Sequence, residues 1–144
     1  MRAGFRFRRP RGQGLRASDS KLCGIALYRI VSRHENGTIQ SATSSEVLQE
    51  ILHRYLSLQR SAQAIQVTQD FIIIVPRVLP VTLVNIERAL ELTARYPDLS
   101  ARDLIRAAVM LNHDITQILS ADVHFDQIEE IERIDPITFA EGAL

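Results

Sequence analysis

The stretch "LSARDLIRAAVMLNHDITQILSADVHFD", residues 99–126, places a helix and a strand next to each other in the chain. Ser100 is a typical N-cap residue and precedes an apolar repeat of helical spacing, so we expect a helix from Ser100 to about Asn112. The segment "QILSA", residues 117–121, is short and apolar, which predicts a buried strand. A helix followed at once by a buried strand is typical of α/β folds.

The same alternation extends to both sides of this stretch. Further helices are expected at residues 44–60, 62–75 and 82–96, and short strands at residues 38–42, 77–81 and 131–134. Residues 20–37 also follow a helical pattern, which ends at the turn dipeptide Asn36-Gly37. Short apolar strands separated by helices predict a parallel sheet in an α/β sandwich.

Four acids lie near the ends of these elements: Glu46, Asp103, Asp122 and Asp126. Ligands of open α/β sheets gather at the carboxyl ends of the strands, and Glu46 and Asp122 each follow an expected strand. Clustered carboxylates repel one another unless a cation neutralises them. Their hard oxygen atoms suit Mg²⁺ or Mn²⁺, which activate water for attack on a phosphodiester.

A structural interpretation of the same acids stays open. Thr43 precedes Glu46 by three residues, and Ser100 precedes Asp103 by three, which is the spacing of a helix capping box. The two acids after the strand also fit ordinary loop positions, where aspartate is common. Spacing alone does not decide between caps and metal ligands.

The charge of the chain is unevenly distributed. The 144 residues carry 17 basic and 17 acidic side chains, but residues 1–21 hold seven of the basic ones and a single acid. The remainder therefore has 10 basic and 16 acidic residues, a net charge of −6. We expect a basic arm over residues 1–19 and one domain over residues 20–144. An acidic body binds RNA poorly by charge alone and needs a cation or a partner.

Other residue classes exclude several functions. The single cysteine, Cys23, allows no internal disulfide and fits a reducing compartment, so we expect a cytoplasmic protein and a buried structural thiol. The sequence contains no run of 18 apolar residues, so no membrane span is predicted. The histidines are scattered and form no zinc motif: His34, His53, His113 and His124. His124 is expected to face solvent.

Four segments taken together resemble a PIN domain, and in particular the VapC-like toxins of bacterial toxin–antitoxin pairs. They are "TSSEVLQEILHRY", "VLPVT", "YPDLSARDLIRAAVMLNHDITQILSADVHFD" and "IERIDP", within residues 20–138. The resemblance implies a three-layer α/β/α sandwich with a central parallel sheet. It also implies a Mg²⁺- or Mn²⁺-dependent ribonuclease that acts on RNA, is inhibited by a cognate antitoxin and forms a homodimer.

The resemblance also implies roles for the four acids. Asp103 matches the acid of "S-A-R-D" and would be a direct metal ligand. Asp122, at the end of the last core strand, and Asp126, in "D-x-x-F-D", would hold the metal or its waters. Glu46, the acid that opens the helix in "S-x-E-V", would complete the cluster.

The chain departs from the family at its beginning. The family starts with a short apolar strand in the middle of the sheet, which ends in Asp-x-Asn and supplies a central metal ligand. Here the corresponding segment, "MRAGFRFRRPRGQGLRASDS", has no Asp-x-Asn and no apolar strand, although "GFRFR" is a candidate substitute. Two hypotheses stay open for residues 1–19: an RNA-binding arm, or upstream coding sequence read in the wrong frame or from a misplaced start.

The leading functional hypothesis is a metal-dependent RNA endonuclease of the toxin type, impaired by the missing acid. The alternative is a catalytically inactive PIN-like scaffold that binds an antitoxin or a partner subunit. A third hypothesis, a nucleic-acid-binding module that uses the arginine-rich arm, rests on composition alone.

Overall fold

The computed structural model describes residues 27–30 and 40–140, and the arm, Cys23, "GFRFR" and the Asn36-Gly37 turn lie outside them. Five strands form one sheet in the order β3-β2-β1-β4-β5. The strands are β1 (Leu27–Ile30), β2 (Gln40–Ser44), β3 (Val78–Leu79), β4 (Gln117–Leu119) and β5 (Glu132–Ile134). The helices are α1 (Ser45–Ser57), α2 (Ser61–Ile74), α3 (Leu83–Arg95), α4 (Ala101–Asn112), the 3₁₀ helix η2 (Val123–Gln127) and α5 (Pro136–Ala140).

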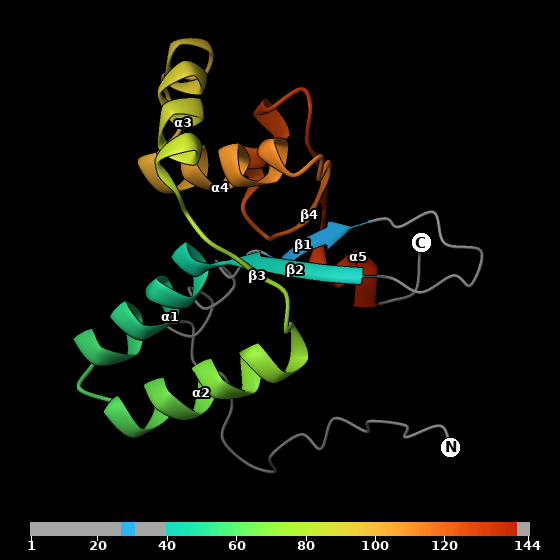
Figure 1. The fold of residues 1–144 in the computed structure, drawn as a ribbon. Coiled ribbons are helices and arrows are strands. Elements are labelled where there is room, and N and C mark those ends of the chain that lie inside the picture. Colours follow the sequence, from blue (N-terminus) through green and yellow to red (C-terminus); the bar gives the residue numbers. More distant parts are fainter. Residues whose placement is uncertain (1–26, 31–39, 141–144) are drawn as a thin grey trace.

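The long helices form two pairs, α1 with α2 and α3 with α4. Figure 1 shows the α3–α4 pair at the top of the view and the α1–α2 pair at the lower left, with β1 and β2 between them. The expectation of an α/β fold is confirmed. The regular three-layer sandwich stays a prediction.

The expectation of a wholly parallel sheet is wrong at its centre. β2 with β3 and β4 with β5 are parallel pairs, but β1 is antiparallel to both of its neighbours, β2 and β4. Residues 27–30 were expected to be helical and instead form this strand. Backbone pairing on both edges outweighs a local helical pattern, because strand formation depends on tertiary context. A connection as short as residues 31–39 also favours antiparallel neighbours over a parallel crossover.

The direction of β1 decides which of its ends faces the candidate acids. Leu27, at the start of β1, pairs with Leu119 at the end of β4, and Ile30 pairs with Gln40 at the start of β2. The chain segments with Glu46 and Asp122 follow the carboxyl ends of β2 and β4. The carboxyl end of β1 therefore lies at the opposite end of the strands. A residue that ends β1 cannot replace the family's first-strand acid.

The other elements agree with the sequence expectations to within a few residues. The helices expected at residues 44–60, 62–75, 82–96 and 100–112 are α1, α2, α3 and α4, and the strand expected at residues 38–42 forms at Gln40–Ser44. Thr82 makes a capping box with Asn85, whose side-chain oxygen accepts from the Thr82 amide at 2.9 Å. The short helices η2 and α5 were not predicted, because neither carries a full helical repeat.

The hydrophobic core centres on α4. Its residues 106–110 are all buried, and Ala107 and Ala108 are fully excluded from solvent, so α3 can approach closely. Phe125 of η2 is also fully buried and joins the same cluster. Within the described part of the chain, no helix has both the length and the apolar character needed to cross a membrane.

Phe125 anchors the segment that follows β4, and its loss should be costly. Phe125→Ala should lower the free energy of unfolding by about 3–5 kcal/mol, since it removes a large buried side chain and leaves a cavity. Its neighbour Val123 is 61% exposed, and Val123→Ala should change the value by less than about 0.5 kcal/mol. Urea unfolding of both variants measures the difference, and equal effects would contradict this packing.

Candidate metal and phosphodiester site

Asp103 lies in the first turn of α4 and is held there by Ser100. The Asp103 amide donates to Ser100 Oγ at 3.2 Å, and the Ser100 hydroxyl donates to Asp103 Oδ2 at 2.7 Å. The Asp103 side chain is only 6% exposed. Ser100 therefore caps the helix, while the Asp103 carboxylate is held rigidly at the surface of α4. The cap and ligand interpretations of this pair are compatible.

Asp122 lies just beyond β4, where buried Ser120 positions it. The Asp122 amide donates to Ser120 Oγ at 3.1 Å, and Asp122 Oδ1 accepts from the backbone N–H of His124 at 3.0 Å. Asp122 thus serves as the N-cap of η2. The turn that this cap stabilises presents the His124 ring on the same side as the Asp122 carboxylate.

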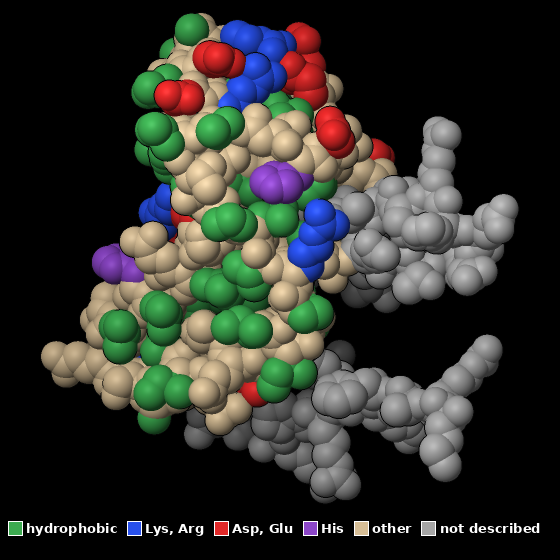
Figure 2. Space-filling model, viewed as in Figure 1, with side chains coloured by type: hydrophobic (Ala, Val, Ile, Leu, Met, Phe, Trp, Pro, Cys, Tyr) green, Lys and Arg blue, Asp and Glu red, His purple; other side chains and the backbone are tan. Residues whose placement is uncertain are grey.

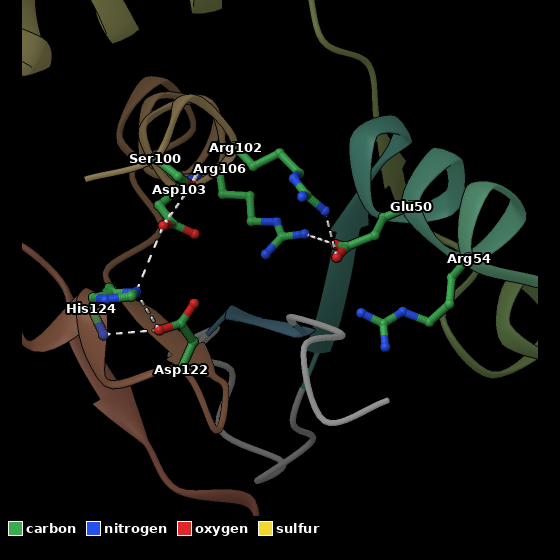
Figure 3. Close-up of a pocket in the computed structure, with 8 residues that line it drawn as sticks. All are labelled: Glu50, Arg54, Ser100, Arg102, Asp103, Arg106, Asp122 and His124. Atoms are coloured by element: carbon green, nitrogen blue, oxygen red, sulfur yellow. Dashed lines mark hydrogen bonds and ion pairs between the residues drawn. The ribbon is translucent and has the colours of Figure 1, made fainter. Parts of the chain in front are cut away.

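Asp103, Asp122 and His124 form one cluster (Figure 3). His124 Nδ1 lies 2.9 Å from Asp122 Oδ1 and 4.0 Å from Asp103 Oδ2. One donor atom from each of the three residues lies within 4.8 Å of the others. Sequence reasoning placed the two aspartates here but left His124 out as a solvent-facing side chain. Its ring is 57% exposed, yet it faces both carboxylates.

Glu46 is not part of this cluster and is held by Arg106. Arg106 Nε donates to Glu46 Oε2 at 2.7 Å, and the same guanidinium forms an ion pair with Glu50. The Glu46 and Arg106 side chains are 10% and 4% exposed. Helix α1 begins at Ser45 with Ser44 as N-cap, so the capping box of Thr43 with Glu46 is not formed.

Burial raises the pKa of Glu46 above its ordinary value. The attraction and hydrogen bond of Arg106 oppose this rise, and the charge of Glu50 adds to it. Burial disfavours an isolated carboxylate, so the ion pair with Arg106 is what keeps a charged form accessible there.

Asp126 is held by an arginine of its own. Arg133 Nε and Nη2 donate to the two Asp126 oxygens at 2.8 and 3.1 Å, a bidentate pair. Arg133 Nη1 also donates to the Ser120 carbonyl at 3.1 Å. The Asp126 side chain is 52% exposed. Asp126 therefore ties η2 to β5, outside the cluster of Asp103, Asp122 and His124.

A pocket of about 260 Å³ joins the cluster to α1. Its lining residues are Glu50, Arg54, Ser100, Arg102, Asp103, Arg106, Asp122 and His124. Figure 3 shows Asp103, Asp122 and His124 on one side and the guanidinium groups of Arg54, Arg102 and Arg106 toward the other. Arg102 Nη1 donates to Glu50 Oε1 at 2.8 Å. Among the described residues, the Arg54 guanidinium has no ion pair.

The arginine side of the pocket was missed from the sequence, although a signal exists. Glu46 and Glu50 are four residues apart on α1, and Arg102 and Arg106 are four apart on α4. Each pair lies on one helix face, so the two faces can meet as complementary charges. The spacing of the charges can be read from the sequence, but predicting that they pair requires knowing that α1 and α4 face each other.

The donor set of the cluster fits a divalent cation. Two aspartate oxygens are hard ligands of the type that Mg²⁺ and Mn²⁺ take, and the Asp103 carboxylate is nearly buried. Within the described chain, Asp103 Oδ1 has no hydrogen bond or ion pair. A nearly buried carboxylate that lacks a full set of donors is stabilised by a cation.

Comparisons with known proteins identify the family of this chain. The PIN domain family model matches residues 25–131. VapC ribonuclease Mb1869c of Mycobacterium bovis and Ribonuclease VapC13 of Mycobacterium tuberculosis are each 42% identical to this chain over 107 residues, which is 74% of this chain and 81% of either relative. No solved structure matches the chain significantly. The chain therefore belongs to the PIN-domain family, as a VapC-like member.

The pKa of Glu46 tests the ion pair directly. A ¹³C NMR titration in EDTA should give a Glu46 pKa above 4.5, and Arg106→Met should raise that pKa further because it removes the attraction. Arg106→Lys, which keeps the charge, should raise it less. A Glu46 pKa that is lower in Arg106→Met would contradict the pairing.

The same shift has a consequence for stability. Because the folded pKa exceeds the unfolded value, the contribution of Glu46 to stability is full below the unfolded pKa. It is lost as the pH rises through the folded pKa.

Proposed function

We propose that this protein is a metal-dependent RNA endonuclease of the VapC type and that Asp103 and Asp122 hold its divalent cation. One observation supports this most strongly: two rigidly held aspartates face arginine side chains across a single pocket. Hydrolysis of a phosphodiester needs both features, a cation to neutralise developing charge and donors that bind phosphate oxygens. The VapC relatives, which are named ribonucleases, support RNA as the substrate.

Several residues at the pocket have a definite task in this proposal. Asp103 and Asp122 would hold the divalent cation, which would supply Lewis-acid activation of the phosphodiester and of the attacking water. Ser100 and Ser120 keep Asp103 and Asp122 in place through the hydrogen bonds described above. The Arg54 guanidinium binds a phosphate oxygen of the RNA. The metal is Mg²⁺ or Mn²⁺, as the oxygen ligands favour.

Glu46 and Asp126 have weaker support as ligands. Each carboxylate is engaged by an arginine, Glu46 by Arg106 and Asp126 by Arg133. For either to bind a cation directly, its ion pair would have to break. Their membership of the metal site stays a prediction, and we propose that in this state they position α4 and η2.

We also propose that the activity is lower than in a PIN domain with the first-strand acid. β1 runs in the opposite direction to the strand that carries that acid in the family, so its carboxyl end lies at the far edge of the sheet. Residues that act together on one cation lose much of their effect when one is missing. The three-layer sandwich and a cytoplasmic location belong to the same proposal.

An RNA cleavage assay tests the assignment. In Mn²⁺, Asp103→Asn and Asp122→Asn should each lower the cleavage rate by about 100-fold or more. Even outer-shell substitutions at metal sites cost about 10–100-fold in affinity or activity. Asp114→Asn is the matched control: Asp114 is exposed, with φ 55°, a conformation that asparagine adopts readily, so it should cleave like the unmodified chain.

The outcomes separate the two functional hypotheses. Equal cleavage by Asp103→Asn and the unmodified chain would refute the assigned site. Absence of cleavage by the unmodified chain, with the fold intact, would favour the alternative of an inactive scaffold that binds an antitoxin or partner subunit.

We propose the cognate antitoxin as the occupant of an exposed apolar surface on α1 and α2. Figure 2 shows hydrophobic side chains gathered over the lower part of the molecule, where Figure 1 places these helices. The exposed members are Leu52, Leu56, Leu58, Ile65, Ile72, Ile73 and Ile74. A surface of this kind marks a protein interface. Glu50 and Arg54 of the same helix α1 line the pocket.

A charge introduced on this surface tests the occupant. Ile73 is 77% exposed, so Ile73→Asp should leave the fold intact. It should abolish co-purification with the co-expressed antitoxin, whereas Leu90→Asp on α3, also exposed, should not. The resemblance also implies a homodimer, and light scattering of the chain alone measures it. A dimer that Ile73→Asp converts to monomer would assign the surface to a second copy instead.

A further inference from the structure

His124 occupies a place that the proposed function leaves without a task. Its ring lies between the carboxylates of Asp103 and Asp122 and faces the pocket (Figure 3). The backbone N–H of His124 is fixed by Asp122, and the next residue, Phe125, is fully buried. The ring is therefore presented by an anchored segment, with its Nδ1 beside the Asp122 carboxylate.

The distances in the cluster match the spacing of ligands around one ion. For metal–ligand distances of about 2.1 Å, adjacent ligands of an octahedral ion lie about 3.0 Å apart and opposite ones about 4.2 Å apart. His124 Nδ1 is 2.9 Å from Asp122 Oδ1 and 4.0 Å from Asp103 Oδ2. When the ring proton is on Nε2, the Nδ1 lone pair is directed to the same space as both carboxylates.

Other donors do not fill this place in the described chain. Glu46 is in its ion pair with Arg106, Asp126 is in its pair with Arg133, and β1 ends at the opposite edge of the sheet. Arginine is a donor only and cannot ligate a cation. Among the described histidines, cysteines and acids, His124 is the residue that groups with Asp103 and Asp122.

We infer that His124 is a metal ligand together with Asp103 and Asp122, and that its nitrogen gives the site a preference for Mn²⁺ over Mg²⁺. This inference rests on the proposed function, whose metal site it specifies. Imidazole nitrogen suits transition-metal ions, while Mg²⁺ takes oxygen ligands and retains its waters. A site with one nitrogen among its ligands therefore discriminates between the two ions, whereas an all-carboxylate site does so weakly.

Pulsed EPR of bound Mn²⁺ tests the nitrogen directly. The unmodified chain with stoichiometric Mn²⁺ should show ¹⁴N modulation in its electron spin echo, and His124→Ala should lose it. His113→Ala is the matched control, since the His113 ring bonds the Val109 carbonyl at the end of α4, and it should keep the modulation. In titration calorimetry, His124→Ala should weaken Mn²⁺ binding about 10-fold or more and Mg²⁺ binding less than about 2-fold.

The outcomes separate this inference from the function on which it rests. Modulation that is absent in the unmodified chain, or that persists in His124→Ala, would overturn the histidine ligand. If RNA is still cleaved with Mn²⁺ in that case, the proposed function stands and only the histidine assignment fails. If the unmodified chain binds neither Mn²⁺ nor Mg²⁺, both fail. Equal weakening for the two ions would overturn the preference for Mn²⁺.

Discussion

The buried guanidinium of Arg106 determines the layout of the site. It pairs with Glu46 and Glu50 of α1 and is almost completely excluded from solvent, so it holds α4 against α1 through charges that cannot be left unpaired. Asp103 lies one turn earlier on the same helix, and that fixed register directs it toward Asp122. The same interaction engages Glu46, which is not part of the cluster of Asp103, Asp122 and His124. Arg106 thus pairs with Glu46, while Arg133 pairs with Asp126, and neither acid belongs to that cluster.

The second constraint is the direction of the central strand. β1 fills the middle of the sheet, where the resemblance expects the first strand, and so satisfies the edges of β2 and β4. Its antiparallel direction places its carboxyl end away from the site. β1 can therefore complete the strand pairing of the sheet without supplying the first-strand acid of the family. A site in this position has to be assembled from α4 and the segment after β4.

The residues predicted correctly were those whose role is local. The Ser100 cap and the helix that follows it were found because cap, apolar repeat and turn lie within a few residues. The strand at β1 was missed because its residues pair with partners far along the chain. The pairing of Glu46 with Arg106 joins residues 60 positions apart, and no pattern within either helix indicates it alone. His124 was judged by its exposure, which is indeed high, and not by the carboxylates around it.

We propose that Arg106 separates Glu46 from a metal site made by Asp103 and Asp122. Anomalous diffraction from crystals soaked in Mn²⁺ tests it most directly, because it locates the ion and the arginine in the same map. We predict one anomalous peak between the carboxylates of Asp103 and Asp122, with Arg106 still bound to Glu46. A peak bound by Glu46, with the Arg106 side chain displaced from it, would contradict this separation.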